Sequence, residues 1–281
     1  MLSKADGSPL LQTGRVAIMG ILNATPDSFS DGGLFLAVDA AVDHVAMMID
    51  EGADIIDIGG ESTRPGAAPV NADEEMQRVI PIIERLAGRF DVTISIDTSK
   101  ALVMDAAVNA GAGMINDVRA LTGKGALSTA ADLNVPVCLM HMQGEPDTMQ
   151  LNPVYDDVTA NVRDYLSQRV AACVAAGLDI NNLILDPGFG FGKTQKQNFT
   201  LLNELRNVRS HDLPILAGLS RKSVIEQTLG LVEHDRVFAS IALALLAVRN
   251  GANIVRVHDV KATTDAIRMA EAVEKLRKEN S

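Results

Sequence analysis

The sequence has few aromatic residues, and this shortage narrows the class of fold. Phe and Tyr together make up 3% of the 281 residues, and tryptophan is absent. Ala, Val, Ile and Leu supply most of the apolar content, and small aliphatic side chains of this kind favour a parallel sheet covered by helices. A hydrophobic content of 47% with 22% charged residues is typical of a globular chain rather than a disordered or fibrous one.

Cysteine and positive charge are also scarce. The two cysteines, Cys138 and Cys173, lie far apart and lack the spacing of a zinc site, so zinc is not expected. Isolated thiols fit a reducing compartment and a role as small core residues. The formal net charge of −11 argues against a general nucleic-acid or anionic-membrane surface. An anionic ligand would therefore need a local basic cluster.

Long hydrophobic runs and a targeting signal are missing as well. The longest apolar stretch, residues 237–248, is too short to span a bilayer. Residues 1–14 lack the basic start and apolar centre of a signal peptide. We therefore expect a soluble, cytoplasmic protein.

Eight short apolar runs recur along the chain, and helical patterns separate most of them. The runs are Val16–Leu22, Ala53–Ile58, Val92–Ile96, Met114–Ile115, Val135–Met140, Leu183–Leu185, Ile215–Leu219 and Ala252–Val257. Apolar residues at helical spacing cover 38–49, 76–86, 158–174, 237–248 and about 262–278, and Asn71 with Glu74 predicts a capping box before the second of these. Apolar strands that alternate with amphipathic helices indicate a parallel sheet of βαβ units.

Eight such units within roughly 250 residues match the size of a TIM barrel. We therefore predict an α/β fold, a TIM (β/α)8 barrel in a single domain over residues 1–281, with its motif-bearing core at about 15–262. An open doubly wound sheet is the alternative. It would be favoured by a glycine fingerprint after the first strand, and residues 20–23 do not form one.

Every apolar run ends in polar or ionisable residues. These are Asn23, 57–64, 97–100, Asn116 and Asp117, 141–143, Asp186, 220–222 and 256–259. The carboxyl ends of barrel strands meet at one face, where the active site of this fold lies. Solvation explains one polar strand end, but eight ends rich in Asn, Asp, Arg, Lys and His favour a functional site.

Two halves of that face differ in chemistry. A cationic cluster of Arg64, Arg221, Lys222, Arg256 and His258 follows mainly the last two strands, the usual phosphate site of this fold. A lone arginine is normally a solvated surface charge, but several at adjacent strand ends favour a phosphorylated small substrate. The other half holds Asp97, Asn116 and Asp186, which suit a planar heterocycle with several N–H donors because a carboxylate accepts two donors at once.

The loop after the sixth run, residues 186–194, resembles a phosphate loop but has Pro187 where that pattern requires glycine. We interpret it instead as a carrier of two aromatic walls for a flat ligand, Phe189 and Phe191. His141 and Cys138 are expected on opposite faces of one strand, so no nucleophilic pair is predicted there. A structural or lid role for His141 is as plausible as a catalytic one.

The polar loop after the first run, residues 23–33, carries an aromatic residue, Phe29, that a solvated turn does not need. An ordinary strand-to-helix connection rich in turn formers is the simpler interpretation. The proline and glycine residues of this loop and of residues 63–66 alternatively predict mobile covers that exclude water.

Taken together, these segments resemble the dihydropteroate synthase family of the folate pathway. The resemblance runs from about Val16 to Val260 and rests on motifs in family order: 23–33, 59–66, 95–98, 115–117, 186–193, 220–222 and 256–259. Residues 1–14 and those after about Lys261 match no motif. The resemblance implies a (β/α)8 barrel, a homodimer, and Mg²⁺ as cofactor. It implies that the enzyme joins a pterin pyrophosphate to 4-aminobenzoate. Sulfonamides would then compete with 4-aminobenzoate for its binding site.

The resemblance also assigns roles to single residues. Asp97, Asp186, Lys222 and Arg256 would be catalytic. The pterin would contact Asp97, Asn116, Met140, Asp186, Phe191 and Lys222. The pyrophosphate would face Asn23, Thr63, Arg64, Arg256 and His258, with Asn23 also at the metal, and 4-aminobenzoate would dock near Phe29, Thr63, Pro65, Ser220 and Ser223.

A dissociative reaction is expected because the electron-rich reduced pterin can spread positive charge, whereas 4-aminobenzoate is a weak nucleophile. Two alternatives remain. A pterin-binding barrel that transfers a methyl group from a reduced folate shares the fold but has no need for a pyrophosphate cluster. A non-catalytic barrel that binds a phosphorylated ligand also fits the strand ends, although it leaves Phe29 unexplained.

Overall fold

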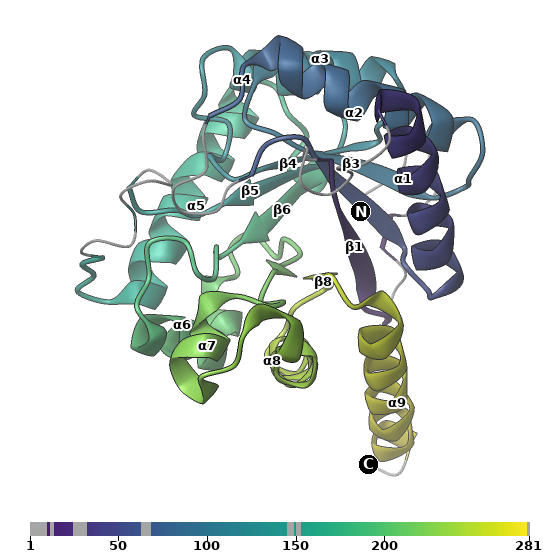
Figure 1. Cartoon of the computed structure of the whole chain (residues 1–281). Helices are drawn as coiled ribbons and strands as arrows, with labels where there is room; N and C mark the ends of the chain where they lie inside the picture. Colours follow the sequence, from purple (N-terminus) through teal and green to yellow (C-terminus); the bar gives the residue numbers. More distant parts are fainter. Residues whose placement is uncertain are drawn as a thin grey trace.

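The computed structural model describes residues 10–11, 14–24, 33–62, 69–144, 149 and 153–279. Its eight strands form one parallel sheet in the order β6-β5-β4-β3-β2-β1-β8-β7. A parallel bridge between Leu185 and Ile215 brings the two edges of this sheet together. The predicted TIM barrel is therefore confirmed, and the open doubly wound alternative is excluded (Figure 1).

Each strand falls on one of the eight predicted runs. The strands are β1 (Ala17–Asn23), β2 (Ile55–Gly59), β3 (Thr93–Asp97), β4 (Met114–Asp117), β5 (Val137–Met140), β6 (Leu183–Asp186), β7 (Leu216–Ala217) and β8 (Ile254–Val257). The seventh run was expected to span five residues but forms a two-residue strand. The others differ from the prediction by one to three residues at their ends, and several extend into the polar residue that follows.

Helices follow the strands and cover the outside of the barrel (Figure 1). They are α1 (Gly33–Asp50), α2 (Ala72–Ala87), α3 (Ala101–Asn109), α4 (Ala126–Leu133), α5 (Val158–Ala175), α6 (Gln195–Asn203), α7 (Ser223–Leu229), α8 (Val237–Arg249) and α9 (Val260–Glu279). Short 3₁₀ turns lie at Ile180–Asn182, Leu205–Val208 and Glu233–Asp235. None of the helices in the described part combines the length and hydropathy needed to cross a bilayer.

The start of α2 shows how side chains set a helix boundary. Asn71 accepts a hydrogen bond from the backbone N–H of Glu74, as an N-cap residue does. The predicted capping box is only half present, because the Glu74 carboxylate pairs with Arg78. A complete capping box occurs instead at α6, where Thr194 and Gln197 satisfy each other's backbone groups.

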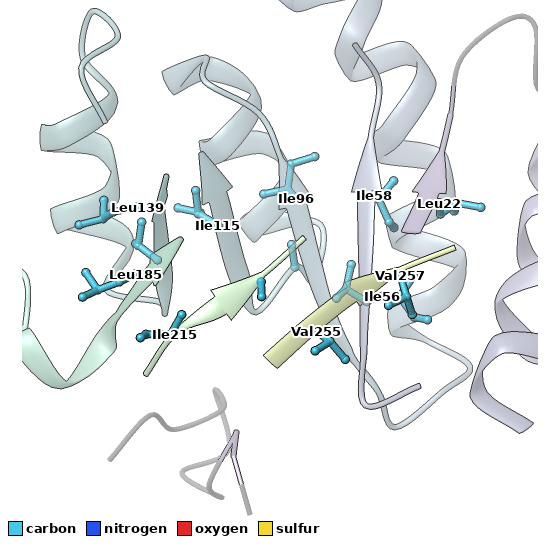
Figure 2. Packing of buried hydrophobic residues seen from close by; sticks show 14 of the residues in the cluster. Leu22, Ile56, Ile58, Ile96, Ile115, Leu139, Leu185, Ile215, Val255 and Val257 are labelled. Atoms are coloured by element: carbon cyan, nitrogen blue, oxygen red, sulfur yellow. The ribbon is translucent and has the colours of Figure 1, made fainter. Parts of the chain in front are cut away.

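The barrel wall separates two apolar clusters. Side chains such as Ile56, Ile96 and Leu139 point outward and pack beneath the helices (Figure 2). The alternate positions point inward and form a smaller cluster: Ala17, Met19, Ile55, Met114, Cys138, Ile184, Leu216 and Ile254, with Leu10 beside them. Cys138 and Cys173 are both free and buried, as expected of small core residues. The inner cluster fills the barrel below the strand ends, and the polar residues begin directly beyond it.

Candidate active site

Side chains alternate along a strand, so only every second strand-end residue faces the interior of the barrel. On β2 the inward residues are Ile55 and then Asp57, whereas Ile56 and Ile58 pack outward. The same alternation places one polar residue beyond the inner apolar layer on four other strands. These residues are Asp97, Asn116, Asp186 and Arg256, all of them predicted site residues.

Arg256 connects two carboxylates across the mouth of the barrel. Its Nε lies 2.6 Å from Asp57 Oδ2, and its Nη2 lies 2.8 Å from Asp97 Oδ2. Asn116 Nδ2 donates to the same oxygen of Asp57 at 3.0 Å. Asp57 Oδ1 is buried and lacks a hydrogen-bond partner among the described residues. Because buried polar atoms are normally paired, this oxygen is an acceptor that a ligand N–H can satisfy.

The charges in this cluster respond differently to burial. Burial raises the pKa of Asp97 to about 7 against the opposing charge of Arg256, and the carboxylate of Asp57 adds to the rise. Burial would lower the pKa of Arg256, but the carboxylates of Asp57 and Asp97 outweigh it and raise that pKa. Arg256 therefore stays cationic, while Asp97 changes its charge near neutral pH.

A second group of predicted residues gathers at the end of β6. Asp186 Oδ1 accepts a hydrogen bond from Gly188 N at 2.7 Å. Lys222 Nζ donates to the carbonyl oxygen of Phe189 and lies 4.7 Å from the centre of the Phe191 ring. Burial raises the pKa of Asp186 and lowers that of Lys222 to about 8, although each charge attracts the other. The group combines an acceptor, a cation and an aromatic face.

The loop after β6 corrects one prediction. Phe189 is fully buried in the outer core, so its predicted role as a ligand wall is wrong. The gain from burying an aromatic ring decided its orientation, which sequence spacing in a loop does not reveal. Phe191 stays partly exposed beside Lys222. Met140, also predicted at the pterin, is buried on β5 in register with Asp186.

His141 lies on the opposite side of the β5 chain from Cys138, as predicted. Its ring meets that of Tyr165 edge-on with centres 5.0 Å apart, and its Nδ1 lies 3.0 Å from Lys193 Nζ. Burial lowers the pKa of His141 to about 3, and the charge of Lys193 adds to the shift. A neutral, enclosed imidazole fits the structural role that the sequence left open.

Part of the positive charge in the predicted cationic cluster is neutralised by a neighbouring carboxylate. Arg221 Nε lies 3.0 Å from Asp259 Oδ2, which neutralises this arginine. Ser220 Oγ lies 3.0 Å from His258 Nδ1, so these two predicted residues do meet. Ser220 is buried.

Several predicted residues are exposed or lie outside the described part of the chain. Ser223 is exposed as the first residue of α7, and Asn23 is exposed as the last residue of β1. Outside the described residues fall Phe29, Thr63, Arg64 and Pro65. Their roles, and the predicted covers that contain them, stay predictions.

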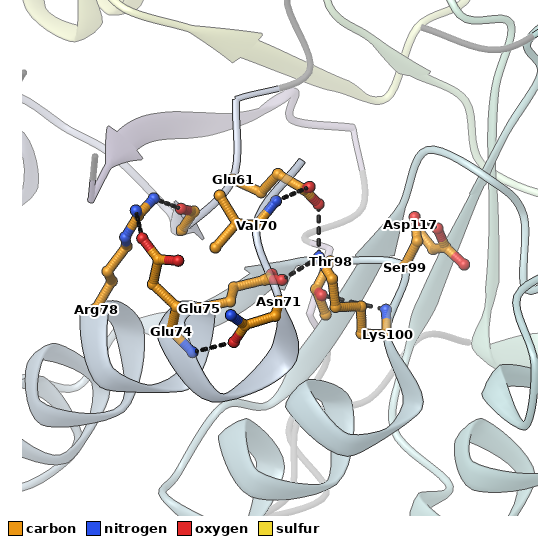
Figure 3. A network of polar contacts seen from close by, with 11 residues as sticks. Glu61, Val70, Asn71, Glu74, Glu75, Arg78, Thr98, Ser99, Lys100 and Asp117 are labelled. Atoms are coloured by element: carbon orange, nitrogen blue, oxygen red, sulfur yellow. Dashed lines mark hydrogen bonds and ion pairs between the residues drawn. The ribbon is translucent and has the colours of Figure 1, made fainter. Parts of the chain in front are cut away.

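A polar network joins the ends of β2 and β3 to α2 (Figure 3). Lys100 Nζ lies 2.6 Å from Glu61 Oε2 and 2.5 Å from Glu75 Oε2, and Glu75 is fully buried. Glu61 Oε1 accepts a hydrogen bond from Val70 N at 2.9 Å, so this carboxylate also links the residues before and after 63–68. Burial would lower the pKa of Lys100, but its bonds to Glu61 and Glu75 raise it.

Three residues that organise this face were not among the predicted site residues. Asp57 was visible as a strand-end acid, and the inward alternation of β2 was the signal that could have selected it. Lys100 followed Asp97 in a strand-end motif without an assigned role. Lys193 stood inside the rejected phosphate-loop pattern, and no simple spacing predicts where its side chain lies.

Comparison with known proteins extends this picture. Residues 19–258 match the family model described as pterin binding enzyme. The dihydropteroate synthase of Escherichia coli K12 is 53% identical over 255 residues, which cover 91% of this chain and 90% of that protein.

Two solved structures are similar over nearly their whole length. The dihydropteroate synthase of Yersinia pestis in complex with a sulfonamide drug has 50% identity and a TM-score of 0.90, covering 94% of this chain and 96% of that one. The dihydropteroate synthase of Xanthomonas albilineans with 4-aminobenzoic acid has 52% identity and a TM-score of 0.87, covering 92% and 93%.

Proposed function

Since the chain belongs to the pterin-binding enzymes and, within them, to the dihydropteroate synthases, we propose how the residues at its barrel mouth carry out that reaction. The enzyme is a transferase of folate biosynthesis. It condenses 6-hydroxymethyl-7,8-dihydropterin pyrophosphate with 4-aminobenzoate and releases 7,8-dihydropteroate and pyrophosphate. The observation that carries the proposal is the ring of inward polar side chains, in which the buried Oδ1 of Asp57 has no hydrogen-bond partner among the described residues.

The pterin is held on its hydrogen-bonding edge. Asp186 accepts from two adjacent N–H groups of the pyrimidine ring, and Asn116 and Asp97 bind its other nitrogens. Lys222 donates to the carbonyl side, and Phe191 lies against a ring face. Support comes from the hydrogen bonds that hold Asn116, Asp97 and Asp186 in place, and from the burial of Asn116 and Asp186, which strengthens hydrogen bonds to a fitting ligand.

Bond breaking precedes bond making in the proposed reaction. The C–O bond between the pterin methylene and the pyrophosphate breaks, and its electron pair leaves with the pyrophosphate. The positive charge on the pterin is stabilised by the ionised Asp97 and Asp186. The amine of 4-aminobenzoate then forms the new C–N bond and loses one proton, which the released pyrophosphate accepts. Fixed charges of this kind are often the largest catalytic contribution, with one well-placed group worth roughly 3–4 kcal/mol.

Arg256 and His258 face the leaving group in this proposal, together with Arg64. Arg256 is already bound to Asp57 and Asp97, so it connects the acids beside the pterin to the region of the pyrophosphate. Ser220, which lies beside His258, and Ser223, the exposed first residue of α7, are assigned to 4-aminobenzoate with Phe29, Thr63 and Pro65.

We assign Mg²⁺ to Asn23. Asn23 offers an amide oxygen at the exposed end of β1, and no cluster of three or more His, Cys, Asp or Glu side chains that could enclose a metal occurs in the described ranges. Mg²⁺ usually keeps several waters and uses few protein ligands together with substrate phosphates. When bound at Asn23, it would neutralise charge on the pyrophosphate.

We further propose a homodimer in the cytoplasm. Exposed apolar side chains gather on α8 and α9, which contact each other: Phe238, Leu246, Met269, Val273 and Leu276. Apolar surface of this kind supports an interface between copies. Light scattering on the wild type and on a Phe238→Glu variant tests this part, and a monomeric wild type would contradict it.

Pyrophosphate release tests the reaction itself. The purified chain is incubated with the dihydropterin pyrophosphate, with and without 4-aminobenzoate, and Mg²⁺ is varied. Release that depends on the amine is expected, and release that ignores it would exclude the synthase reaction. Positional isotope exchange in the pyrophosphate at low 4-aminobenzoate tests the order of bond breaking, and its absence would remove the support for a dissociative step.

A further inference from the structure

Lys193 is a buried lysine whose hydrogen bonds go to neutral acceptors throughout the described part of the chain. Its side chain is 2% exposed. Nζ donates to the carbonyl oxygens of Gly188 at 2.8 Å and Phe191 at 2.9 Å, and it lies 3.0 Å from His141 Nδ1. Burying a charged group without a hydrogen-bonded counter-ion costs free energy. Ion pairing therefore does not explain why Lys193 is buried here.

The acceptors lie on both sides of a close contact between two backbones. Gly188 and Gly192 have φ values of +67° and +61°, which side-chain-bearing residues rarely adopt. A Cβ at Gly188 would lie 1.9 Å from the carbonyl oxygen of His141, and one at Gly192 would lie 2.4 Å from that of Gln143. The loop after β6 therefore rests directly on the chain that leaves β5, and Lys193 bonds to both.

Each loop residue that Lys193 binds also serves the site. Gly188, whose carbonyl accepts from Lys193, donates its N–H to Asp186. Phe191, whose carbonyl also accepts from Lys193, carries the ring beside Lys222. Asp186 is near enough for its charge to act on Lys193, which adds attraction without a hydrogen bond.

We propose that Lys193 is a positioning residue for the pterin, because it fixes the Gly188 and Phe191 peptides that orient the Asp186 carboxylate and the Phe191 ring. The inference rests on the proposed function, since it assigns Asp186 and Phe191 to that ligand. Lys193 itself touches no substrate in this role. The glycine-rich loop thus uses a lysine as an internal brace and not as a phosphate ligand.

The test compares Lys193→Met with Lys196→Met. The control removes the same charge from an exposed position on α6. Steady-state kinetics measure KM for each substrate, and calorimetry measures binding of the dihydropterin pyrophosphate. Loss of the hydrogen bonds that Lys193 donates to Gly188 and Phe191 predicts that Lys193→Met weakens pterin binding about tenfold. KM for 4-aminobenzoate is expected to change less than about twofold, and Lys196→Met to resemble the wild type.

Other outcomes are equally informative. A folded Lys193→Met enzyme with unchanged pterin affinity would overturn the proposal, as would equal losses for both substrates. If that variant does not fold, Tyr155→Phe replaces it, since Tyr155 Oη donates to Gly192 O of the same loop at 2.8 Å. This milder change is expected to weaken pterin binding about threefold, and no change would overturn the proposal. Wild-type pyrophosphate release without dependence on 4-aminobenzoate would instead refute the proposed function and leave the positioning question to calorimetry with the pterin.

Discussion

Lys193 and Lys100 each tie chain segments together at the mouth of the barrel, but they do so with different partners. Lys193 is enclosed by carbonyl oxygens and an imidazole, and burial lowers its pKa to about 7 although Asp186 lies nearby. Lys100 binds the carboxylates of Glu61 and Glu75, and these raise its pKa despite burial. The comparison shows that a lysine can hold a loop in place either by donating to neutral acceptors or by pairing with carboxylates. Its pKa falls in the first case and rises in the second.

Each lysine is also near a carboxylate of the site, in space or along the chain. Lys193 donates to the carbonyl oxygen of Gly188, whose N–H donates to Asp186. Lys100 follows Asp97 by three residues along the chain. Among the described residues, hydrogen bonds link Lys193 to Asp186 through Gly188, whereas Lys100 is bonded to Glu61 and Glu75 and is a neighbour of Asp97 only along the chain. Variants of the lysines and of the acids can separate the two arrangements.

The largest effect is expected at the acid that Lys193 supports. Asp186→Asn removes the charge to which we assign two pterin N–H groups. At about 2 kcal/mol for each such hydrogen bond, pterin affinity is expected to fall about a thousandfold. Calorimetry with the dihydropterin pyrophosphate measures this. Retained affinity would contradict the assignment of Asp186 to the pterin.

A large effect on stability is expected at the other lysine. Lys100→Met leaves the fully buried Glu75 without its cation, and breaking a buried pair costs about 3 kcal/mol of unfolding free energy. Urea denaturation measures the loss. The double variant with Glu75→Leu serves as the control, because it removes the stranded charge and recovers much of the loss. A double variant less stable than Lys100→Met would argue against this explanation.

The pH dependence of stability distinguishes the two lysines most directly. The folded pKa of Lys193, about 7, is below its unfolded value of about 10.5, so between these values the unfolded state binds more protons. The unfolding free energy of the wild type relative to Lys193→Met should therefore rise from pH 7 to 9, by up to about 1.4 kcal/mol per pH unit.

Lys100 predicts the reverse sign. Its folded pKa is raised, so its contribution is complete below about pH 10.5 and is lost only as the pH rises further. The difference between wild type and Lys100→Met should stay level from pH 7 to 9. Denaturation curves of the wild type and both variants at several pH values measure these differences in unfolding free energy. If both differences changed with pH in the same way, the proposed contrast between the two lysines would be wrong.

A smaller effect is expected in the rate near neutral pH. With a pKa of about 7, Asp97 is mostly protonated at pH 6 and mostly ionised at pH 8. If the ionised form stabilises the cationic pterin, kcat/KM rises with pH and levels off above about 7, with a limiting slope of about tenfold per pH unit well below that value. Rate profiles of the wild type and Asp97→Asn test this, and the same slope in both would assign the titration to another group.

The smallest effect should come from an ion pair outside the braces. Lys261 and Asp265 are an exposed i,i+4 pair on α9. Lys261→Met is expected to change the unfolding free energy by less than about 0.5 kcal/mol, because solvent screens such pairs. The same urea experiments measure it. If Lys261→Met lost as much unfolding free energy as Lys100→Met, burial would not explain why the two lysines differ in their contribution to stability.

Much of the architecture was predictable because each strand is a short apolar run. The ends of these runs also identified Asp97, Asn116, Asp186 and Arg256 as neighbours, since parallel strands bring their carboxyl ends together. Which acid pairs with Arg256 was not predictable, because that depends on the stagger of strands far apart in the sequence. The orientations of Phe189 and Lys193 were hidden for another reason. Both lie in a loop whose glycines adopt positive φ, and no simple periodicity relates sequence position to direction there.

The contacts of Arg256 have a consequence for how the enzyme is made. Arg256 is separated from Asp57 by 199 residues and from Asp97 by 159 residues. During synthesis the acids emerge from the ribosome long before the arginine that joins them. The separation between β1 and its partner strand β8 is longer still, since Ala17 pairs with Ile254. Chains that end before residue 252 thus hold clustered carboxylates beside an open strand edge, a state prone to aggregation. The site that we assign to the substrates includes Arg256 and is completed only when the last strand closes the sheet, so unfinished chains are not expected to bind the pterin.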